Sequence, residues 1–499
     1  MRLLYNLLIT LLHVPVAAYW FARALINRSY RDRMGQRFGI GYPQLEKCIW
    51  IHAVSVGEVQ AAVPLVRAIQ NRFPDHHTLI TTVTPTGAAR VAANFGDSVS
   101  HCYIPFELPL AVDRFFSSVK PELALVMETE IWPNLYQGCG QRDIPLVLVS
   151  ARISPKSVDK YRKLLPLFRE TLSHGIIIAA QSEADADRFR SLGASPVRTW
   201  VTGNIKFDIE LPEDLADRGR EFRQSTFGER PVWVAASTHD QEEQMVLEAH
   251  RRLLERFPDL LLILVPRHPE RFAAVADLID RQGFKKVSRT ESRSCDAATT
   301  VFLGDTMGEV PMFYAASDLA FVGGSLVPVG GHNLLEPAAL GLPLVSGPHV
   351  YNAQDISDLF IDLGACHIVA DAAQLAAAVD ELLDDPAAAA EQGGRGLEIV
   401  QQNRGALARL LNLLEPLIGA EQDVIYRTSR NDNETETLAV FAELSFDITD
   451  RLSLDIGARY SEDEKTTRKT GDVGVGTPGN ATLVIDANGV PTGALDAQN

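Results

Sequence analysis

Three acidic side chains in the first half of the chain stand where they could do chemistry. Glu128 and Glu130 directly follow an apolar stretch, in the run METEIWPN. Two carboxylates this close repel each other, and in a cleft that repulsion raises a pKa or demands a cation, which suits acid–base chemistry or the placement of charge. Glu58 opens a helix after the apolar stretch and glycine turn of HAVSVGE, a position that faces the cleft of an open α/β sheet. The structural alternatives are an exposed loop for the pair and a first-turn residue favoured by the helix dipole for Glu58.

Cationic side chains supply the complementary groups for an anionic ligand. Lys206, in the run TGNIKFD, lies where it could reach an anion in the cleft. Pro266, Arg267 and His268 end a strongly apolar stretch, and an arginine at the end of a strand suits a phosphate or a carboxylate. The run 304–310, GDTMGEV, also follows a strand, and a tight turn of this kind can offer backbone N–H groups to a ligand.

The most informative run is 321–345, FVGGSLVPVGGHNLLEPAALGLPLV. Its two glycine pairs, 323–324 and 330–331, allow a ligand to approach the backbone closely. A helix that begins near Asn333 would offer free N–H groups and a positive dipole end to an anion, so a nucleotide phosphate fits. Glu336 in the first turn of that helix suits a sugar, because a carboxylate can accept hydrogen bonds from ribose hydroxyls.

The elements that position these groups follow from the pattern of apolar runs. Val- and Ile-rich runs alternate with helix-length segments and are too continuously apolar for half-exposed strands, which predicts a parallel sheet covered on both faces. The pattern occurs twice, on either side of a polar hinge within 203–230. Two Rossmann-like α/β domains that face a cleft are therefore expected. The predicted strands are 48–54, 78–83, 123–127, 145–149 and 176–180, then 232–236, 260–265, 301–303, 319–322 and 342–345.

The N-terminus carries an apolar stretch, residues 3–22, of about the 20-residue length that crosses a bilayer core. No small-residue cleavage motif follows it, which argues against a cleaved signal. The sequence predicts a membrane anchor helix over 1–27, spanning or half-inserted, with a soluble amphipathic helix as the alternative. Five arginines come next and favour the cytoplasmic face and anionic headgroups: Arg23, Arg28, Arg31, Arg33 and Arg37.

Composition excludes several classes of protein. The chain has 499 residues with 46% hydrophobic and 22% charged residues, which is too long for one domain and too hydrophobic for disorder. A net charge of −17 argues against a nucleic-acid partner. The five cysteines have no paired spacing and favour a reducing compartment. The histidines lack zinc-binding spacing, and the chain has neither a P-loop nor a dinucleotide fingerprint, so no metal or other cofactor is expected.

Taken together, the motifs resemble one family, the 3-deoxy-D-manno-octulosonic acid (Kdo) transferases of lipopolysaccharide synthesis. These are membrane-anchored glycosyltransferases of the GT-B type. The resemblance implies an inverting transfer of Kdo from CMP-Kdo to a lipid A precursor, lipid IVA, at the cytoplasmic face of the inner membrane and its anionic lipid surface. It covers 1–418 and rests on eight runs in the family's order: HAVSVGE, TPTG, METEIWPN, VTGNIKFD, LVPRHPER, GDTMGE, FVGGSL and GGHNLLEPA.

The resemblance also implies roles for individual residues. Glu58 would be the general base that takes the proton of the acceptor hydroxyl, and Glu128 and Lys206 would stabilise the transition state. An acceptor domain is implied over 28–205 and a donor domain over 206–420. Two alternatives stay open: another GT-B nucleotide-sugar transferase or epimerase, and an inactive membrane scaffold that binds lipid A precursor. The positions implied to contact the CMP part of the donor are Pro266, Arg267, Met307, Gly308, Glu309, Asn333, Leu334, Leu335 and Glu336.

Residues 421–499 depart from the family pattern. Even positions are apolar over 438–448, a turn follows at 449–451, and the alternation resumes over 452–460, which predicts a β-hairpin. The hairpin resembles a fragment of a TonB-dependent outer-membrane receptor and is expected to be followed by a polar, disordered loop from Ser461. A lone hairpin cannot close a barrel in lipid, so a foreign fusion with no part in transfer is hypothesised. The alternative is a native hairpin that adds to a sheet edge.

Overall fold

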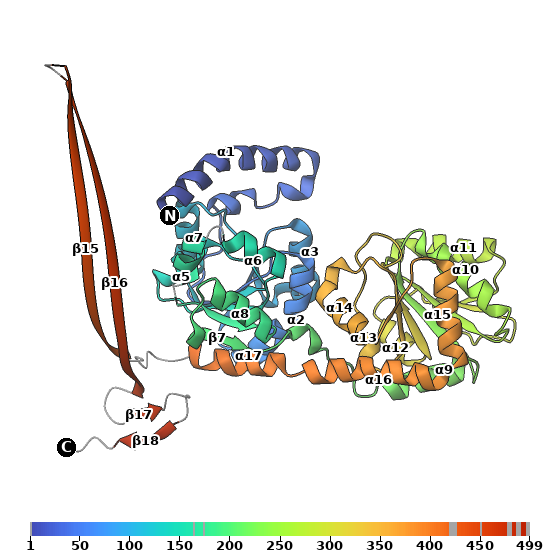
Figure 1. The fold of residues 1–499 in the computed structure, drawn as a ribbon. Coiled ribbons are helices and arrows are strands. Elements are labelled where there is room, and N and C mark those ends of the chain that lie inside the picture. Colours follow the sequence, from blue (N-terminus) through green and yellow to red (C-terminus); the bar gives the residue numbers. More distant parts are fainter. Residues whose placement is uncertain are drawn as a thin grey trace. The chain divides into compact units, whose positions relative to one another are not determined.

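The chain divides into two compact units, residues 1–415 and 416–499, and each is described by itself. The first unit contains two seven-stranded parallel sheets with helices on their faces (Figure 1). The two Rossmann-like domains expected of a GT-B fold are therefore both present. The computed structural model describes residues 2–162, 165–172, 175–418, 427–449, 452–476, 482–485 and 491–495.

The first lobe has the strand order β3-β2-β1-β4-β5-β6-β7. Its inner strands are buried on both faces, as their continuous apolar runs predict. The strands are β1 (Cys48–His52), β2 (His77–Thr82), β3 (Ser100–Tyr103), β4 (Pro121–Met127), β5 (Leu146–Ala151), β6 (Ile177–Ala180) and β7 (Thr199–Val201). The helices are α2 (Val56–Arg72), α3 (Pro85–Phe95), α4 (Pro109–Val119), α5 (Pro133–Gly140), α6 (Pro155–Arg162), α7 (Leu165–Leu172) and α8 (Glu183–Ser191).

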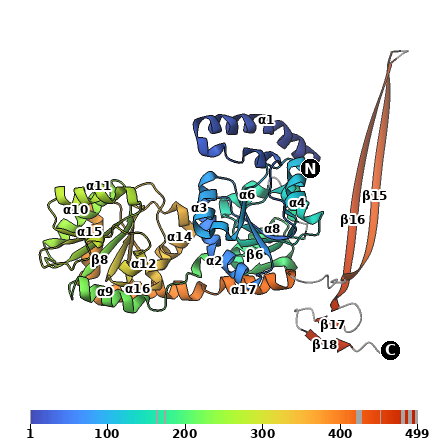
Figure 2. The ribbon, with the colours of Figure 1, turned by 180° about the vertical axis from the view of Figure 1, so that it is seen from behind.

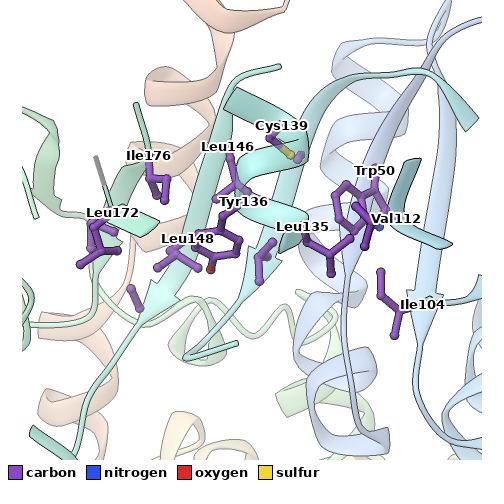
Figure 3. Close-up of a cluster of buried hydrophobic side chains, with 14 of the residues drawn as sticks. Trp50, Ile104, Val112, Leu135, Tyr136, Cys139, Leu146, Leu148, Leu172 and Ile176 are labelled. Carbon is purple, nitrogen blue, oxygen red and sulfur yellow. The ribbon is translucent and has the colours of Figure 1, made fainter. Parts of the chain in front are cut away.

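The core of the first lobe fixes the helix that follows β4. Leu135 and Tyr136 of α5 are buried in one hydrophobic cluster with Leu146 and Leu148 of β5 (Figure 3). Burial of large side chains on both elements stabilises their contact. The short segment between β4 and α5, which carries Glu128 and Glu130, is therefore held at both ends.

The second lobe repeats the design with the strand order β10-β11-β9-β8-β12-β13-β14. Its strands are β8 (Val232–Thr238), β9 (Leu261–Pro266), β10 (Lys286–Ser288), β11 (Val301–Leu303), β12 (Leu319–Val322), β13 (Leu344–Ser346) and β14 (His367–Ile368). The helices are α9 (Leu215–Thr226), α10 (Glu242–Leu254), α11 (Phe272–Arg281), α12 (Val310–Ala315), α13 (Leu335–Ala339), α14 (Gln354–Asp362), α15 (Ala372–Asp384) and α16 (Pro386–Asn403).

The chain returns to the first lobe after the second is complete. Helices α16 and α17 (Ala406–Leu414) run along one side of both lobes (Figures 1 and 2), and α17 packs on α2. The Asp208 carboxylate accepts hydrogen bonds from the N–H groups of Gly405 and Leu407 at 2.5 Å, which fixes the start of α17 beside the hinge. Helix α17, which the prediction assigned to the donor domain, therefore packs on the first lobe.

The N-terminal helix α1 (Arg2–Ile26) contains a stretch, Tyr5–Ile26, that is long and apolar enough to cross a membrane, with a mean hydropathy of 1.5. One of its faces lies along the first lobe. Tyr5 donates a hydrogen bond to Glu107 at 3.0 Å, and the ring of Trp20 lies 4.1 Å from the Arg37 guanidinium. The opposite face exposes apolar side chains, among them Leu11 at 67%. One face of the helix therefore contacts the lobe, and the opposite face is apolar and exposed.

The second unit contains the predicted hairpin. Strands β15 (Arg427–Thr449) and β16 (Leu452–Gly476) pair antiparallel, and the register places Leu444 opposite Ile456, as the alternating pattern requires. The loop expected from Ser461 is wrong, because strand pairing continues through 461–473 against 427–439. Two short strands, β17 (Thr482–Ile485) and β18 (Pro491–Leu495), complete this sheet. Two residues of the predicted turn, Asp450 and Arg451, lie outside the described residues.

Candidate active site

A polar cavity of about 350 Å³ brings the three predicted catalytic side chains together. Glu58 and Glu128 line it from the carboxyl ends of β1 and β4, and Lys206 lines it from the hinge. Tyr351 and Asn352 line it from the second lobe. Its volume lies in the usual range for small-molecule sites, about 300–1,000 Å³. The cleft expected between two Rossmann-like lobes is thus present where these side chains meet.

Glu58 combines a structural and a chemical position. Ser55 caps α2, and the Glu58 carboxylate accepts hydrogen bonds from Val54 N–H at 2.8 Å and from the Ser55 hydroxyl at 3.1 Å. Burial, helped by the nearby carboxylates of Glu130 and Glu128, raises the pKa of Glu58 to about 7, although the hydrogen bonds from Val54 and Ser55 act to lower it. A carboxylate with such a pKa is a far better proton acceptor at neutral pH than an ordinary one.

Glu128 and Lys206 form an ion pair with 2.7 Å between Oε1 and Nζ. Glu128 has a backbone φ of 55°, a left-handed conformation that is uncommon for glutamate. Ser150, at the end of the neighbouring β5, has a φ of 49° and accepts a hydrogen bond from Ile205 N–H at 3.2 Å. Asn204 accepts one from Lys206 N–H at 3.0 Å. The strained end of β4 therefore positions the Glu128 carboxylate, and the strained end of β5 holds the turn that carries Lys206.

The predicted pair of carboxylates is divided between two surroundings. The Glu130 carboxylate accepts a hydrogen bond from the Trp132 indole N–H at 2.8 Å and lines a neighbouring cavity. Burial raises the pKa of Glu130, and the charge of Glu128 adds to that rise. The expected cation is thus Lys206, which pairs with Glu128. Of the two carboxylates, Glu128 lines the polar cavity and Glu130 does not.

The predicted donor positions share the carboxyl edge of the second sheet. Strands β11, β9, β8 and β12 are neighbours there, so the segments that follow them converge. The side chain of Arg267 makes no hydrogen bond or ion pair within the described part of the chain. It lies close enough to Glu336 to lower the pKa of that carboxyl, although burial raises it more. Arg267 is therefore a cation available to an anionic ligand.

The other donor positions differ in what they can offer. Leu334 and Leu335 are buried in the core of the second lobe, so only their backbone could face a ligand, and Leu335 N–H already donates to the Asn333 side chain at 3.0 Å. Met307 is 56% exposed, next to Gly308. Glu309 pairs with Arg289 at 2.9 Å. Helix α13 begins at Leu335, two residues after the predicted start, with Asn333 donating to Glu336 at 3.4 Å.

Gly324 of the first glycine pair binds one of the protein's own carboxylates. Glu242, which is fully buried, accepts hydrogen bonds from the N–H groups of His239 (3.1 Å), Gly324 (2.7 Å), Ser325 (3.0 Å) and Leu326 (2.9 Å). The Gly323 N–H donates to the Ala236 carbonyl at 2.8 Å, so the N–H groups of both glycines are already hydrogen-bonded within the protein. A Cβ at Gly324 would lie 2.8 Å from the His332 ring. At the second pair, a Cβ at Gly330 would lie 2.5 Å from the Asn352 amide.

Replacing Glu242 tests this reading. In Glu242→Gln an amide N–H₂ would face backbone N–H groups, so charge-assisted bonds are lost without replacement. We expect the free energy of unfolding to fall by about 2–3 kcal/mol. Urea and thermal unfolding of the full chain measure it, with Glu248→Gln as the matched control, since Glu248 is half exposed on the same helix. Equal stability of the two variants would contradict the assignment.

Arg152 is a lining residue that the sequence reasoning missed. It follows β5 and pairs with Asp355 of α14 at 2.8 Å, so the pair joins the two lobes across the cavity. Asn204 donates a hydrogen bond to the same carboxylate at 3.4 Å. The sequence signal that could have identified Arg152 was its position just after the end of a strand, which Glu128 shares. Among the described residues, no cluster of three or more His, Cys, Asp or Glu side chains could hold a metal ion.

Comparison with known proteins gives matches over both lobes. Residues 32–209 match a family model described as 3-deoxy-D-manno-octulosonic-acid transferase (kdotransferase), and 229–397 match glycosyl transferases group 1. A 3-deoxy-D-manno-octulosonic acid transferase of Haemophilus influenzae is 43% identical over 394 residues, 78% of this chain and 92% of the relative. One of Bordetella pertussis is 36% identical over 384 residues, 74% of this chain and 87% of the relative. The C-terminal CMP-Kdo binding domain of WaaA from Acinetobacter baumannii is 38% identical and matches 38% of this chain and 100% of that domain, with a TM-score of 0.37.

Proposed function

Because the chain belongs to the 3-deoxy-D-manno-octulosonic acid transferase family, we propose that it moves Kdo from CMP-Kdo to a lipid A precursor, lipid IVA, with inversion at the anomeric carbon. The chain is a glycosyltransferase of lipopolysaccharide synthesis by its relatives. The observation that supports the finer proposal is the polar cavity, where Glu58 has a pKa of about 7 beside the Glu128–Lys206 pair. The donor positions lie on the other lobe.

In the proposed reaction, Glu58 accepts the proton of the acceptor hydroxyl. The hydroxyl oxygen forms a bond to the anomeric carbon of Kdo while the bond from that carbon to the CMP phosphate oxygen breaks, and CMP leaves with the electron pair. One direct displacement inverts the anomeric carbon. Lys206 gives one N–H to Glu128 and keeps others for developing negative charge, and Arg267 offers its guanidinium to the phosphate.

The N-terminal helix supports a place at the cytoplasmic face of the inner membrane. Its outer face exposes apolar side chains, and Arg28 and Arg31 directly after it are exposed. An apolar helix face next to basic residues suits an anionic lipid surface. Since the first lobe contacts α1 at Tyr5 and at Trp20, we infer that the helix lies in the membrane–water interface, parallel to the membrane surface.

The pH dependence of transfer follows from the pKa of Glu58. A general base works when ionised, so kcat/KM should rise with pH and level off above about 7. At pH 5, two units below that pKa, about one enzyme in a hundred has the base ionised, and kcat/KM should be about a hundredfold below its plateau. Initial rates between pH 4.5 and 9 measure this. An ascending limb of the kcat/KM profile with its midpoint near pH 4.5, the ordinary pKa of a glutamate carboxyl, would contradict the role of Glu58 as the general base.

Removal of the second unit should leave transfer intact. Residues 1–415 contain both sheets and every predicted site residue. We therefore expect a chain that ends at residue 420 to keep the kcat/KM of the full chain in the same detergent. A folded truncation that loses transfer would refute the hypothesis that 421–499 takes no part in it.

The donor and the stereochemistry can be tested together. We expect calorimetric titration to show binding of CMP and not of UDP, and NMR of the product to show an anomeric configuration opposite to that of the donor. Tight UDP binding would favour the UDP-sugar alternative, and retention of configuration would exclude a single displacement by a base at Glu58.

A further inference from the structure

A second cavity meets the polar one and differs from it in chemistry. It has a volume of about 480 Å³ and lies between α1 and the segment that joins β4 to α5. Ile9 lines it from α1, and Ile131 and Trp132 line it from that segment. Both cavities are lined by Thr129 and Tyr161, so they are adjacent at these two side chains. We call this second cavity the α1 groove.

The carboxylates at the α1 groove are already bonded to the protein. Glu107 accepts hydrogen bonds from the N–H groups of Asn134 at 2.7 Å and Leu135 at 3.0 Å, which caps the start of α5. Glu130 accepts one from Trp132. With these acceptors engaged, the surface that the groove presents to a ligand is mainly hydrocarbon.

The outer face of α1 indicates where an apolar ligand would come from. Leu7, Leu8 and Leu11 are exposed by 58%, 52% and 67%, whereas Ile9 on the same helix is half-buried at the groove. A contiguous apolar face of this kind marks an interaction surface, and a bilayer is the cover proposed above for α1. A lipid in that bilayer would have its chains next to the groove.

We propose that the α1 groove binds a fatty acyl chain of the lipid acceptor while the sugar of the same molecule lies in the polar cavity at Glu58. The inference rests on the proposed function, which makes the acceptor an acylated sugar. Two adjacent cavities of opposite polarity fit one amphipathic ligand, because a sugar alone would leave the apolar cavity empty and a fatty acid alone would leave the polar one empty. The chain lies away from the reacting atoms, so its burial contributes to binding and not to the chemical step.

Neighbouring residues on α1 provide a matched pair of variants. Ile9→Trp places a large ring in the groove, and Leu8→Trp places the same ring on the exposed outer face. Exclusion of about two methylene groups from the groove should raise KM for the acylated acceptor about tenfold in Ile9→Trp. We expect kcat, CMP affinity and the KM for an acceptor with its acyl chains removed to stay within twofold. Leu8→Trp should match the wild type, and equal thermal unfolding of both variants shows that they are folded.

A crosslinking measurement tests the site without turnover. An acceptor with a diazirine at the end of an acyl chain is irradiated with the full chain in detergent, and modified peptides are identified by mass spectrometry. Crosslinks to Ile9, Ile131 or Trp132 that excess unlabelled acceptor abolishes would support the groove. Crosslinks confined to Leu7, Leu8 and Leu11, or an equal rise in KM in both variants, would overturn it. If the wild type crosslinks in the groove but transfers no Kdo, the proposed function fails and the groove does not.

Discussion

Glu58→Gln should lower kcat by about 10²–10⁴-fold, the contribution of a positioned general base, while CMP affinity changes by no more than a few fold. Glutamine keeps the shape of the side chain and can accept the Val54 N–H hydrogen bond, but it cannot take a proton. The donor positions lie on the second lobe, so the substitution leaves them untouched. Steady-state transfer gives kcat, and calorimetric titration gives the affinity for CMP.

A carboxylate on the same lobe provides the control. Glu46 is exposed, and Glu46→Gln should transfer Kdo at the wild-type rate. Transfer by Glu58→Gln within tenfold of the wild type would show that another group takes the proton. A parallel loss of CMP affinity would show instead that the residue supports the donor site through the packing of the lobes.

Lys206→Met should lower kcat by about 10²–10³-fold, as expected when a cation that faces developing negative charge is removed. It should also move the pH limb of kcat/KM to higher pH. The loss of Lys206 leaves the Glu128 carboxylate without its ion pair, and the charge of Glu128 already raises the pKa of Glu58. Rate measurements between pH 5 and 10 separate the two effects.

The double variant Lys206→Met, Glu128→Gln tests the cause of that displacement. With the carboxylate neutralised, the pH limb should return to or below its wild-type position although kcat stays low. Glu128→Gln alone should move the limb to lower pH, because one of the charges that raises the pKa of Glu58 is gone. A limb that stays in place in all three variants would mean that the pair does not act on Glu58.

The strands that the sequence pattern predicted are the inner ones, and the strands it missed are the edges. The edge strands are β3, β7, β10 and β14. An edge strand has a neighbour on one side only and tolerates polar residues, as Ser100–Tyr103 and Lys286–Ser288 show, so the continuous apolar run that marks an inner strand is absent. The pattern therefore predicted both domains and their cleft without giving the full width of either sheet.

The candidate site was predictable as a set of positions but not as a set of bonds. Glu128 and Lys206 are 78 residues apart, and only the end of β4 and the hinge turn bring them to 2.7 Å. The pattern also could not distinguish a glycine that approaches a ligand from one that approaches the protein. At Gly324 and Gly330 the neighbours are His332 and Asn352. A buried carboxylate such as Glu242, which accepts hydrogen bonds from four backbone N–H groups, gives no signal in the sequence beyond its charge.

The role of Glu58 in transfer to lipid is tested most directly by mass spectrometry of the lipid after incubation with CMP-Kdo and a tetra-acylated lipid A precursor. The wild type and Glu46→Gln should each convert the precursor to a product that carries at least one Kdo residue, and Glu58→Gln should leave it unmodified. A Kdo-bearing product from Glu58→Gln in the wild-type amount, or an unmodified precursor with the wild type, would contradict the account.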